Sequence, residues 1–235
     1  MNEALEKLLA HPRIWRSGGA GRARSLDPHG AAPGVPTGHA ALDRELPGGG
    51  WPRQALTEIL IEGHGRGELR LLMPALAELG QNDGEGETGW LAWIAPPLLP
   101  YPPALGQWGV DLSRVLVVQP KRRADVLWAA EQALASGNCA AVLLWPEAIG
   151  ARARASRHAR TGRRAAAFPS RRLQLAAERG GALSFAFRPA SARAEISAAA
   201  LRLLLARGEQ GLDAVILKSR GGRPARVRNV VHEVE

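Results

Sequence analysis

Short apolar runs, separated by glycine-containing turns and amphipathic stretches, set the pattern of the chain between residues 56 and 187. The runs lack polar alternation, which is typical of strands in a parallel sheet covered by helices on both faces. The stretches between them repeat their apolar positions with the period of a helix. The predicted strands are 56–61, 90–95, 115–118, 139–145 and 182–187, and the predicted helices are 68–79, 123–136 and 172–179.

The C-terminal part follows a different pattern. Strand-like runs at 201–206, 214–218 and 225–231 follow one another directly, with glycine-containing turns at 208–211 and 221–222. Consecutive strands joined by short turns pair antiparallel. The predicted fold class is therefore α/β, with a mostly parallel sheet flanked by helices and an antiparallel C-terminal hairpin or meander.

The chain before residue 37 is predicted to lie outside this core. Residues 1–16 place leucines on one helical face, and residues 17–36 are rich in Gly, Pro and Arg, as in a flexible linker. The core then runs from 37 to 235 and includes an Arg-rich loop at 151–170. Within it, the Pro-rich stretch 96–103 is predicted to interrupt regular structure.

Composition narrows the class of protein. A chain of 235 residues with 46% hydrophobic and 23% charged residues is not wholly disordered. No apolar run reaches the ~18–20 residues of a membrane-spanning helix, and the start lacks a signal-peptide core. One cysteine and no Cys/His cluster argue against a disulfide framework or a metal site. We expect a cytoplasmic protein that binds neither membrane nor cofactor.

The net charge of +9 is concentrated in one segment. Residues 151–172 hold eight arginines and no carboxylate, and like charges this dense repel one another unless an anionic partner neutralises them. Guanidinium groups match phosphate oxygens, so the DNA backbone is the predicted partner, and a solvated basic loop is the alternative. The predicted nucleic-acid-binding residues are Arg152, Arg154, Arg157, Arg160, Arg163, Arg164, Arg171 and Arg172.

A glycine-rich turn follows the first predicted strand. Gly63, Gly65 and Gly67 lie where a phosphate loop, G-x-x-x-x-G-K-[ST], would present backbone N–H groups to a nucleotide. Glu68 takes the position of the lysine, and Leu69 takes that of the hydroxyl residue that binds Mg²⁺. The loop is therefore predicted to be degenerate, and a tight turn without a ligand is the favoured interpretation.

The flanking residues resemble the RecA recombinase core. The resemblance rests on Pro36–Asp43, Leu46–Pro52, Glu58-Ile59 and Gly109–Pro120, and it extends from Thr37 to about Val231. It implies a RecA-like core and maps two further catalytic positions onto this chain. The glutamate that activates water falls on Pro96, and the aspartate that supports Mg²⁺ falls on Trp145. With Glu68 and Leu69, all four positions are lost, which implies a protein without ATPase activity.

A narrower resemblance is to the ImuA family of accessory proteins in bacterial mutagenic translesion synthesis, also described as SulA-like. It is carried by WLAWIAPPLLPYPPAL, GVDLSRVLVVQPKRRADVLWAAEQALASG, RRLQLAAERGGALSFAFRP and ILKSRGGRPARVRNV. The resemblance implies a damage-induced, nucleoid-associated factor. Its implied partners are an ImuB-type inactive Y-family polymerase and an error-prone replicative-type DNA polymerase. If the protein uses RecA-type surfaces, the shared fold predicts RecA itself as a further partner.

Two alternatives remain open at this point: a SulA-type cell-division inhibitor that binds FtsZ, and a RecA-family ATPase with a divergent loop. Trp15 and Trp51, beside a linker and a turn, are predicted to anchor a partner, because Trp is enriched at interface hot spots. Trp90, Trp93, Trp128 and Trp145 are predicted to pack within the protein.

Overall fold

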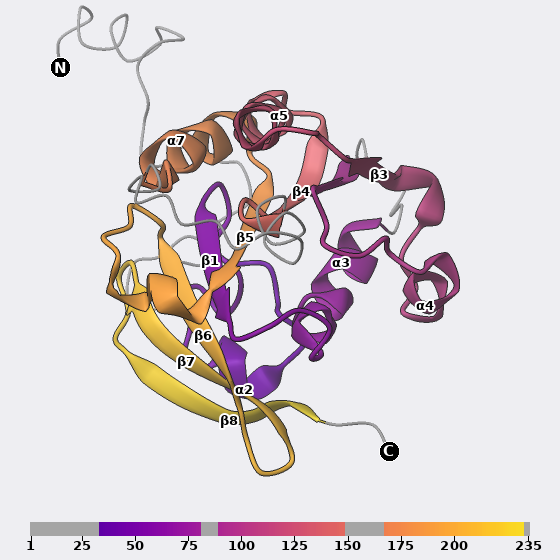
Figure 1. Cartoon of the computed structure of the whole chain (residues 1–235). Coiled ribbons are helices and arrows are strands. Elements are labelled where there is room, and N and C mark those ends of the chain that lie inside the picture. Colours follow the sequence, from indigo (N-terminus) through magenta and orange to yellow (C-terminus); the bar gives the residue numbers. More distant parts are fainter. Residues whose placement is uncertain (1–32, 81–88, 149–166, 233–235) are drawn as a thin grey trace, which may run out of the picture.

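The computed structural model describes residues 33–80, 89–148 and 167–232, and all the strands in them form one sheet (Figure 1). The spatial order of the eight strands is β3-β2-β4-β5-β1-β6-β7-β8. Their bounds are β1 Leu56–Ile61, β2 Trp90–Ile94, β3 Val115–Val118, β4 Cys139–Leu144, β5 Leu183–Pro189, β6 Leu201–Arg207, β7 Gly211–Ser219 and β8 Ala225–His232.

The pairing confirms the mixed sheet predicted from the sequence. The strands from β3 to β6 are parallel, with Thr57 of β1 opposite Phe185 of β5 on one side and Leu201 of β6 on the other. The last two pairings, β6 with β7 and β7 with β8, are antiparallel. The chain is thus a mixed α/β protein with a C-terminal antiparallel meander.

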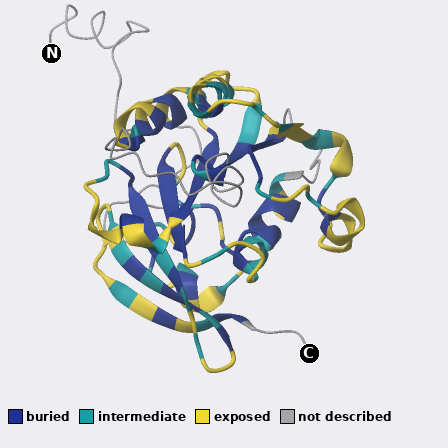
Figure 2. Cartoon of the chain, in the orientation of Figure 1, coloured by how far each residue is buried: buried dark blue, intermediate teal, exposed yellow. Residues whose placement is uncertain are grey.

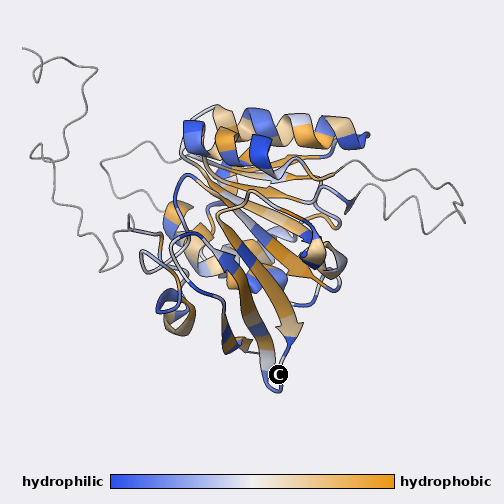
Figure 3. Cartoon of the chain, turned by 90° about the vertical axis from the view of Figure 1, so that its left-hand side faces the viewer, coloured by the Kyte–Doolittle hydropathy of each residue, from blue (hydrophilic) through white to orange (hydrophobic). Residues whose placement is uncertain are grey.

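Helices cover both faces of the sheet (Figure 3). The α-helices are α2 Ala40–Asp43, α3 Met73–Gly80, α4 Pro102–Gln107, α5 Arg123–Ala135 and α7 Ser170–Gly180, with 3₁₀ turns η1 Glu68–Leu71, η2 Leu112–Arg114 and η3 Ala190–Ala194. α5 and α7 contribute to one hydrophobic core, and α2, η1 and α3 contribute to the other. Figure 2 shows the buried strands between these layers.

Two predictions about helices need correction. The stretch 68–79 is not one helix, because it divides into η1 and α3. Pro74 lies in the first turn of α3, where a missing backbone N–H costs nothing. The Pro-rich stretch is not wholly irregular either, since α4 begins within it and carries Pro102 and Pro103 at its first positions.

The last residues of the predicted linker pack against the core. Val35 is 2% exposed and forms an antiparallel bridge with Trp51. A Cβ on Gly50 would lie 2.1 Å from the Val35 carbonyl oxygen, so only glycine allows this approach. The core therefore begins before residue 37. The predicted helix 1–16 and the linker up to residue 32 lie outside the described residues.

A buried ion network joins the central strands. Glu58 of β1 is fully buried, and its carboxylate lies 3.0 Å from Nε of Arg202 on β6 and 3.7 Å from the guanidinium of Arg188 on β5. The hydroxyl of Ser197 donates a hydrogen bond to the same carboxylate. Arg202 also donates to the backbone carbonyl oxygens of residues 192 and 195. Each buried charge is thus paired, as burial requires.

Candidate functional site

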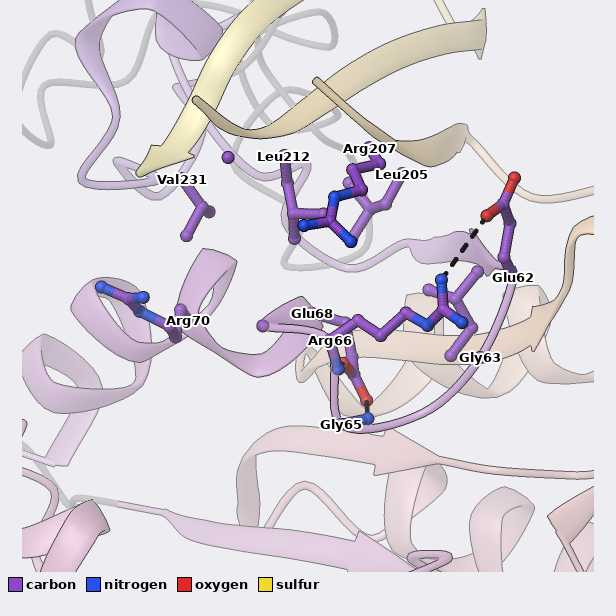
Figure 4. Close-up of a pocket in the computed structure, with 13 residues that line it drawn as sticks. Glu62, Gly63, Gly65, Arg66, Glu68, Arg70, Leu205, Arg207, Leu212 and Val231 are labelled. Atoms are coloured by element: carbon purple, nitrogen blue, oxygen red, sulfur yellow. Dashed lines mark hydrogen bonds and ion pairs between the residues drawn. The ribbon is translucent and has the colours of Figure 1, made fainter. Parts of the chain in front are cut away.

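The glycine-rich loop between β1 and η1 holds a carboxylate of its own chain. Gly65 and Gly67 have φ values of 77° and 91°, which glycine adopts without strain. This path turns the backbone N–H groups of Gly65 and Arg66 onto the two carboxylate oxygens of Glu68, at 2.8 Å each (Figure 4). Glu68 is 6% exposed. The donors that a phosphate loop would offer to a nucleotide are therefore occupied by Glu68.

A cavity of about 480 Å³ adjoins this loop on the side of β6, β7 and β8. Its wall combines the basic side chains of Arg66, Arg70 and Arg207 with apolar residues of the C-terminal strands. Figure 4 shows Arg66 extending across the cavity toward Glu62, and the two groups form an exposed ion pair at 3.9 Å. Exposed pairs of this length are weak.

A second cavity, of about 300 Å³, lies between the same loop, the Pro-rich segment and α4. We call it the indole pocket, because the rings of Trp93 and Trp145 line it. The four positions that the phosphate-loop motif and the RecA resemblance assign to lost catalytic groups, Glu68, Leu69, Pro96 and Trp145, also line it. The structure thus brings these positions together around one space.

The side chains at these four positions differ from those that a phosphate-loop hydrolase uses. Glu68 is its one lining carboxylate among the described residues, and both Glu68 oxygens are held by the loop. Pro96 and Leu69 offer no side-chain group that could accept a proton or bind a cation. Glu68, Leu69 and Pro96 are therefore not placed to activate a water molecule for attack on a phosphate.

The two indole groups of the pocket are packed but not hydrogen-bonded. Trp93 stacks on Trp145 at 5.7 Å between ring centroids, and Trp145 stacks on Phe187 at 4.8 Å. Trp93 and Trp145 are 1% and 2% exposed, and neither Nε1–H has a hydrogen-bond partner in the described part of the chain. Buried indole N–H groups usually have one.

Large apolar side chains are exposed mainly at the β3 end of the sheet. Eleven such residues are exposed in the described chain, and apart from Leu175 and Ile196 they lie between residues 90 and 128. We call this group the edge surface: Trp90, Leu98, Leu99, Tyr101, Trp108, Leu112, Leu116, Val117 and Trp128. Strand β3 is the last strand at this side of the sheet, on the same side of the molecule as α4 in Figure 1. Exposed apolar patches of this kind are typical of interaction sites.

This distribution corrects the prediction for two tryptophans. Trp90 is 47% exposed and Trp128 is 63% exposed, so they do not pack in the core. Trp93 and Trp145 are buried as predicted. Sequence reasoning missed the edge surface, although Leu98, Leu99 and Tyr101 within a Pro-rich loop are a signal, because large apolar residues in loops find few core positions.

The predicted partner anchors are placed differently. Trp51 is fully buried and meets Phe185 edge-to-face at 5.2 Å, so its ring supports the core and leaves no surface for a partner. Trp15 lies outside the described residues.

Of the predicted DNA-contacting residues, the structure describes Arg171 and Arg172, at the start of α7. Both are exposed, and Arg172 forms an ion pair with Glu131 of α5. The other six, Arg152, Arg154, Arg157, Arg160, Arg163 and Arg164, lie outside the described residues.

The described residues on the two sides of the Arg-rich segment, Glu147 and Phe168, both contact Arg188 of β5. Phe168 is buried beneath the guanidinium of Arg188, whose Cζ lies 4.3 Å from the ring centroid, so this ring is not available for stacking on a base. Arg188 also pairs with Glu147 at 3.3 Å. Burial raises the pKa of Glu147 above its ordinary value, against the opposing attraction of Arg188. Glu147 is therefore held in a partly desolvated position where the basic segment begins.

The described residues contain neither a metal-binding cluster nor a membrane-spanning helix. No group of three or more His, Cys, Asp or Glu side chains is arranged to hold a metal ion there. Among the described helices, none combines the length and the apolar character needed to cross a membrane.

The fold and the site together define a mixed α/β protein with exposed apolar side chains near one edge of its sheet. The N–H groups of its glycine-rich loop are hydrogen-bonded to Glu68 of the same chain. No protein-family model matches the chain. Two proteins named cell division inhibitor SulA are similar to it: one from Photorhabdus laumondii, 29% identical over 137 residues, and one from Edwardsiella piscicida, 34% identical over 95 residues. The similarity covers 57% and 40% of this chain.

The chain spans 63% and 54% of the length of these two relatives. A crystal structure of SulA from Pseudomonas aeruginosa is 29% identical over 57% of this chain and 97% of that chain, with a TM-score of 0.39. The amino-acid sequence of the chain is therefore similar to those of proteins named SulA.

Proposed function

We propose that this protein belongs to the DNA-damage response, and that it acts by binding partner proteins without hydrolysing a nucleotide. One observation carries the proposal: Glu68, Leu69, Pro96 and Trp145 surround one apolar pocket, and Glu68 fills the loop that would hold a phosphate. The edge surface supplies apolar area for a protein contact. The similarity to SulA proteins supports the place in the damage response.

The first candidate function is inhibition of cell division through FtsZ. It is supported by the two relatives named cell division inhibitor SulA, which match the chain at about 30% identity. On this candidate the protein contacts FtsZ through an apolar surface and needs no DNA. Its basic segment is then a solvated loop.

The second candidate function is that of an accessory factor in error-prone translesion synthesis. It is supported by the extent of the ImuA resemblance, whose four sequence blocks lie between Trp90 and Val230, whereas the similarity to the SulA proteins covers at most 57% of the chain. On this candidate the partners are an ImuB-type inactive polymerase, an error-prone replicative-type polymerase and RecA. The arginines between residues 151 and 172 would then hold the DNA backbone.

Purified proteins distinguish the two candidates. Inhibition of GTP-dependent FtsZ assembly, measured by light scattering and pelleting, would support the first candidate. Co-elution with the ImuB-type protein or the error-prone polymerase in size-exclusion chromatography would support the second. Absence of any association with FtsZ, the two polymerases and RecA would overturn the proposal.

The basic segment supplies a further discriminator. Replacement of its eight arginines by alanine should reduce the salt dependence of DNA binding under the second candidate, because fewer counterions are released. The same variant should inhibit FtsZ as the parent does under the first. A non-hydrolysable ATP analogue should leave the melting temperature unchanged, whereas a raised melting temperature would support the divergent ATPase.

A further inference from the structure

We propose that the indole pocket receives one large apolar side chain of a partner protein, with an acidic group of the same partner against Arg70. This inference rests on the proposed function as a partner-binding protein, and it names the part of the surface that recognises the partner. Four kinds of observation support it: the size of the pocket, its unpaired donors, its charge and its mouth.

The size and lining of the pocket suit a single apolar anchor. Its volume of about 300 Å³ is at the lower limit of ligand pockets and is enough for one aromatic or leucine side chain. The base is formed by the fully buried stack of Trp93 and Trp145, and Met73 and Leu105 complete the apolar wall. Interface hot spots are anchors of this type seated in preformed pockets.

Two buried donors on the lining residues lack a partner in the described chain, and an occupant that carries oxygen atoms could pair with them. Trp93 and Trp145 both line the pocket, both are at least nine-tenths buried, and both have an Nε1–H without a hydrogen-bond partner in the described residues. A purely hydrocarbon occupant would leave these donors unpaired. A peptide segment brings backbone carbonyl oxygens together with its side chain, and these oxygens can accept from an indole N–H.

One cation without an ion pair on the lining favours an acidic group on the partner. Arg70 lines it and is half-buried, and its guanidinium has no ion pair with another described residue. His64, which is exposed, adds a second basic group to the lining. The one carboxylate of the lining, Glu68, is held by the backbone of the loop. A carboxylate of the partner next to its apolar anchor would therefore meet a cation that is available.

The mouth of the pocket favours a protein over a small molecule. Leu98, Leu99, Tyr101 and Trp108 line the pocket and yet are 66%, 73%, 70% and 42% exposed. These four exposed side chains form an apolar rim that a small ligand in the pocket would leave uncovered. A protein that places an anchor in the pocket covers this rim, as surrounding contacts do at interface hot spots.

The test uses indole-3-acetate, which combines an aromatic ring with a carboxylate, and indole, which lacks the charge. In ¹H–¹⁵N spectra of the full chain, the indole signals of Trp93 and Trp145 are assigned by their loss in the variants Trp93→Phe and Trp145→Phe. We expect these two signals to move on titration with indole-3-acetate. We expect Arg70→Gln to weaken indole-3-acetate binding severalfold and indole binding little. Signals that stay in place would overturn the proposal.

A matched pair of variants links the pocket to the partner. Ala104 lines the pocket and is exposed, so Ala104→Trp should fill the space from its mouth; Ala124→Trp adds the same ring to an exposed position of α5 away from it. We expect Ala104→Trp to abolish probe binding. It should also weaken, at least tenfold, the affinity for whichever of FtsZ, the two polymerases or RecA binds the parent protein, whereas Ala124→Trp should keep both affinities within about twofold of the parent. If Ala104→Trp does not melt as the parent does, Leu99→Asp at the mouth takes its place.

The outcomes separate this inference from the proposed function. Partner binding that is unaffected by Ala104→Trp would overturn the pocket as the recognition site and leave the proposed function standing. Probe binding without binding of any partner would overturn both, because the pocket would then be an aromatic-anion site and no protein would fill it.

Discussion

The substitution Glu68→Ala tests whether this carboxylate occupies the glycine loop. It removes two hydrogen bonds of 2.8 Å, from the N–H groups of Gly65 and Arg66 to a charged acceptor. Hydrogen bonds to charged groups contribute about 1.5–3 kcal/mol each, but water can reach the freed donors through the adjoining cavity and recovers part of this. We expect a loss of about 2 kcal/mol, which corresponds to a melting temperature lower by roughly 4–8 °C for a domain of this size.

The substitution should also create an anion site. The freed N–H groups lie at the start of η1, beside Arg66, so phosphate should bind the variant and raise its stability, by about 2.7 kcal/mol at a hundred times its dissociation constant. Differential scanning fluorimetry in a phosphate series at constant ionic strength measures both effects. Glu62→Ala removes a neighbouring carboxylate that makes no hydrogen bond to the loop, and it should show neither effect. A Glu68→Ala protein with unchanged melting temperature and no phosphate response would refute the reasoning.

Three further predictions concern single side chains. Glu58→Gln should lower the free energy of unfolding by about 3–5 kcal/mol in urea titrations, because it leaves buried Arg202 and Arg188 without their shared carboxylate; Asp125→Asn, in an exposed pair, should change it little. Hydrogen bonds from the Asn229 N–H and from Arg226 lower the pKa of Asp213. The stability that Asp213 contributes should therefore be lost as the pH falls below about 4, and Asp213→Asn should flatten the acid limb of a pH–melting curve. Burial raises the pKa of the Cys139 thiol, so iodoacetamide should alkylate it more slowly than free cysteine at pH 7.5, and equal rates would contradict this.

The sequence predicts the strands well because their apolar runs are short and end at turn residues. The strands 56–61 and 115–118 agree with the structure at both ends, and the boundaries of the others differ by three residues or fewer. These boundaries depend on local chemistry, on glycine, proline and side-chain period, which are visible in any window of the chain.

The sequence does not predict which strand lies at the edge of the sheet. The run Val-Leu-Val-Val of β3 has the composition of a buried strand, yet Leu116 is 46% exposed, because β3 pairs only with β2 in the described sheet. Exposure here depends on the spatial order of the strands, which is not their order along the chain. Trp51 shows the converse. It lies beside a turn in the sequence, but the segment of Val35 pairs with it in an antiparallel bridge, and Trp51 is fully buried.

The candidate site could be predicted only in part from the sequence, because it too depends on how distant segments are arranged in space. The resemblance to RecA marked Glu68, Leu69, Pro96 and Trp145 one by one, and their common pocket depends on how three separate chain segments meet. That Glu68 bonds back onto its own loop depends on the positive φ values of Gly65 and Gly67, which a residue pattern does not specify.

The central position of β1 has a consequence for how the chain folds during its synthesis. Strand β1 begins at Leu56, but its two neighbours are β5, where Ser184 pairs with Leu56, and β6. At about 5–20 residues per second, a ribosome needs on the order of ten seconds to make the intervening chain. Throughout that interval a strand that is buried along its whole length in the folded protein has neither neighbour, and non-local pairings of this kind are slow to form. The nascent chain is therefore exposed to aggregation until β6 emerges, and its yield should depend on chaperones that bind apolar segments on the ribosome.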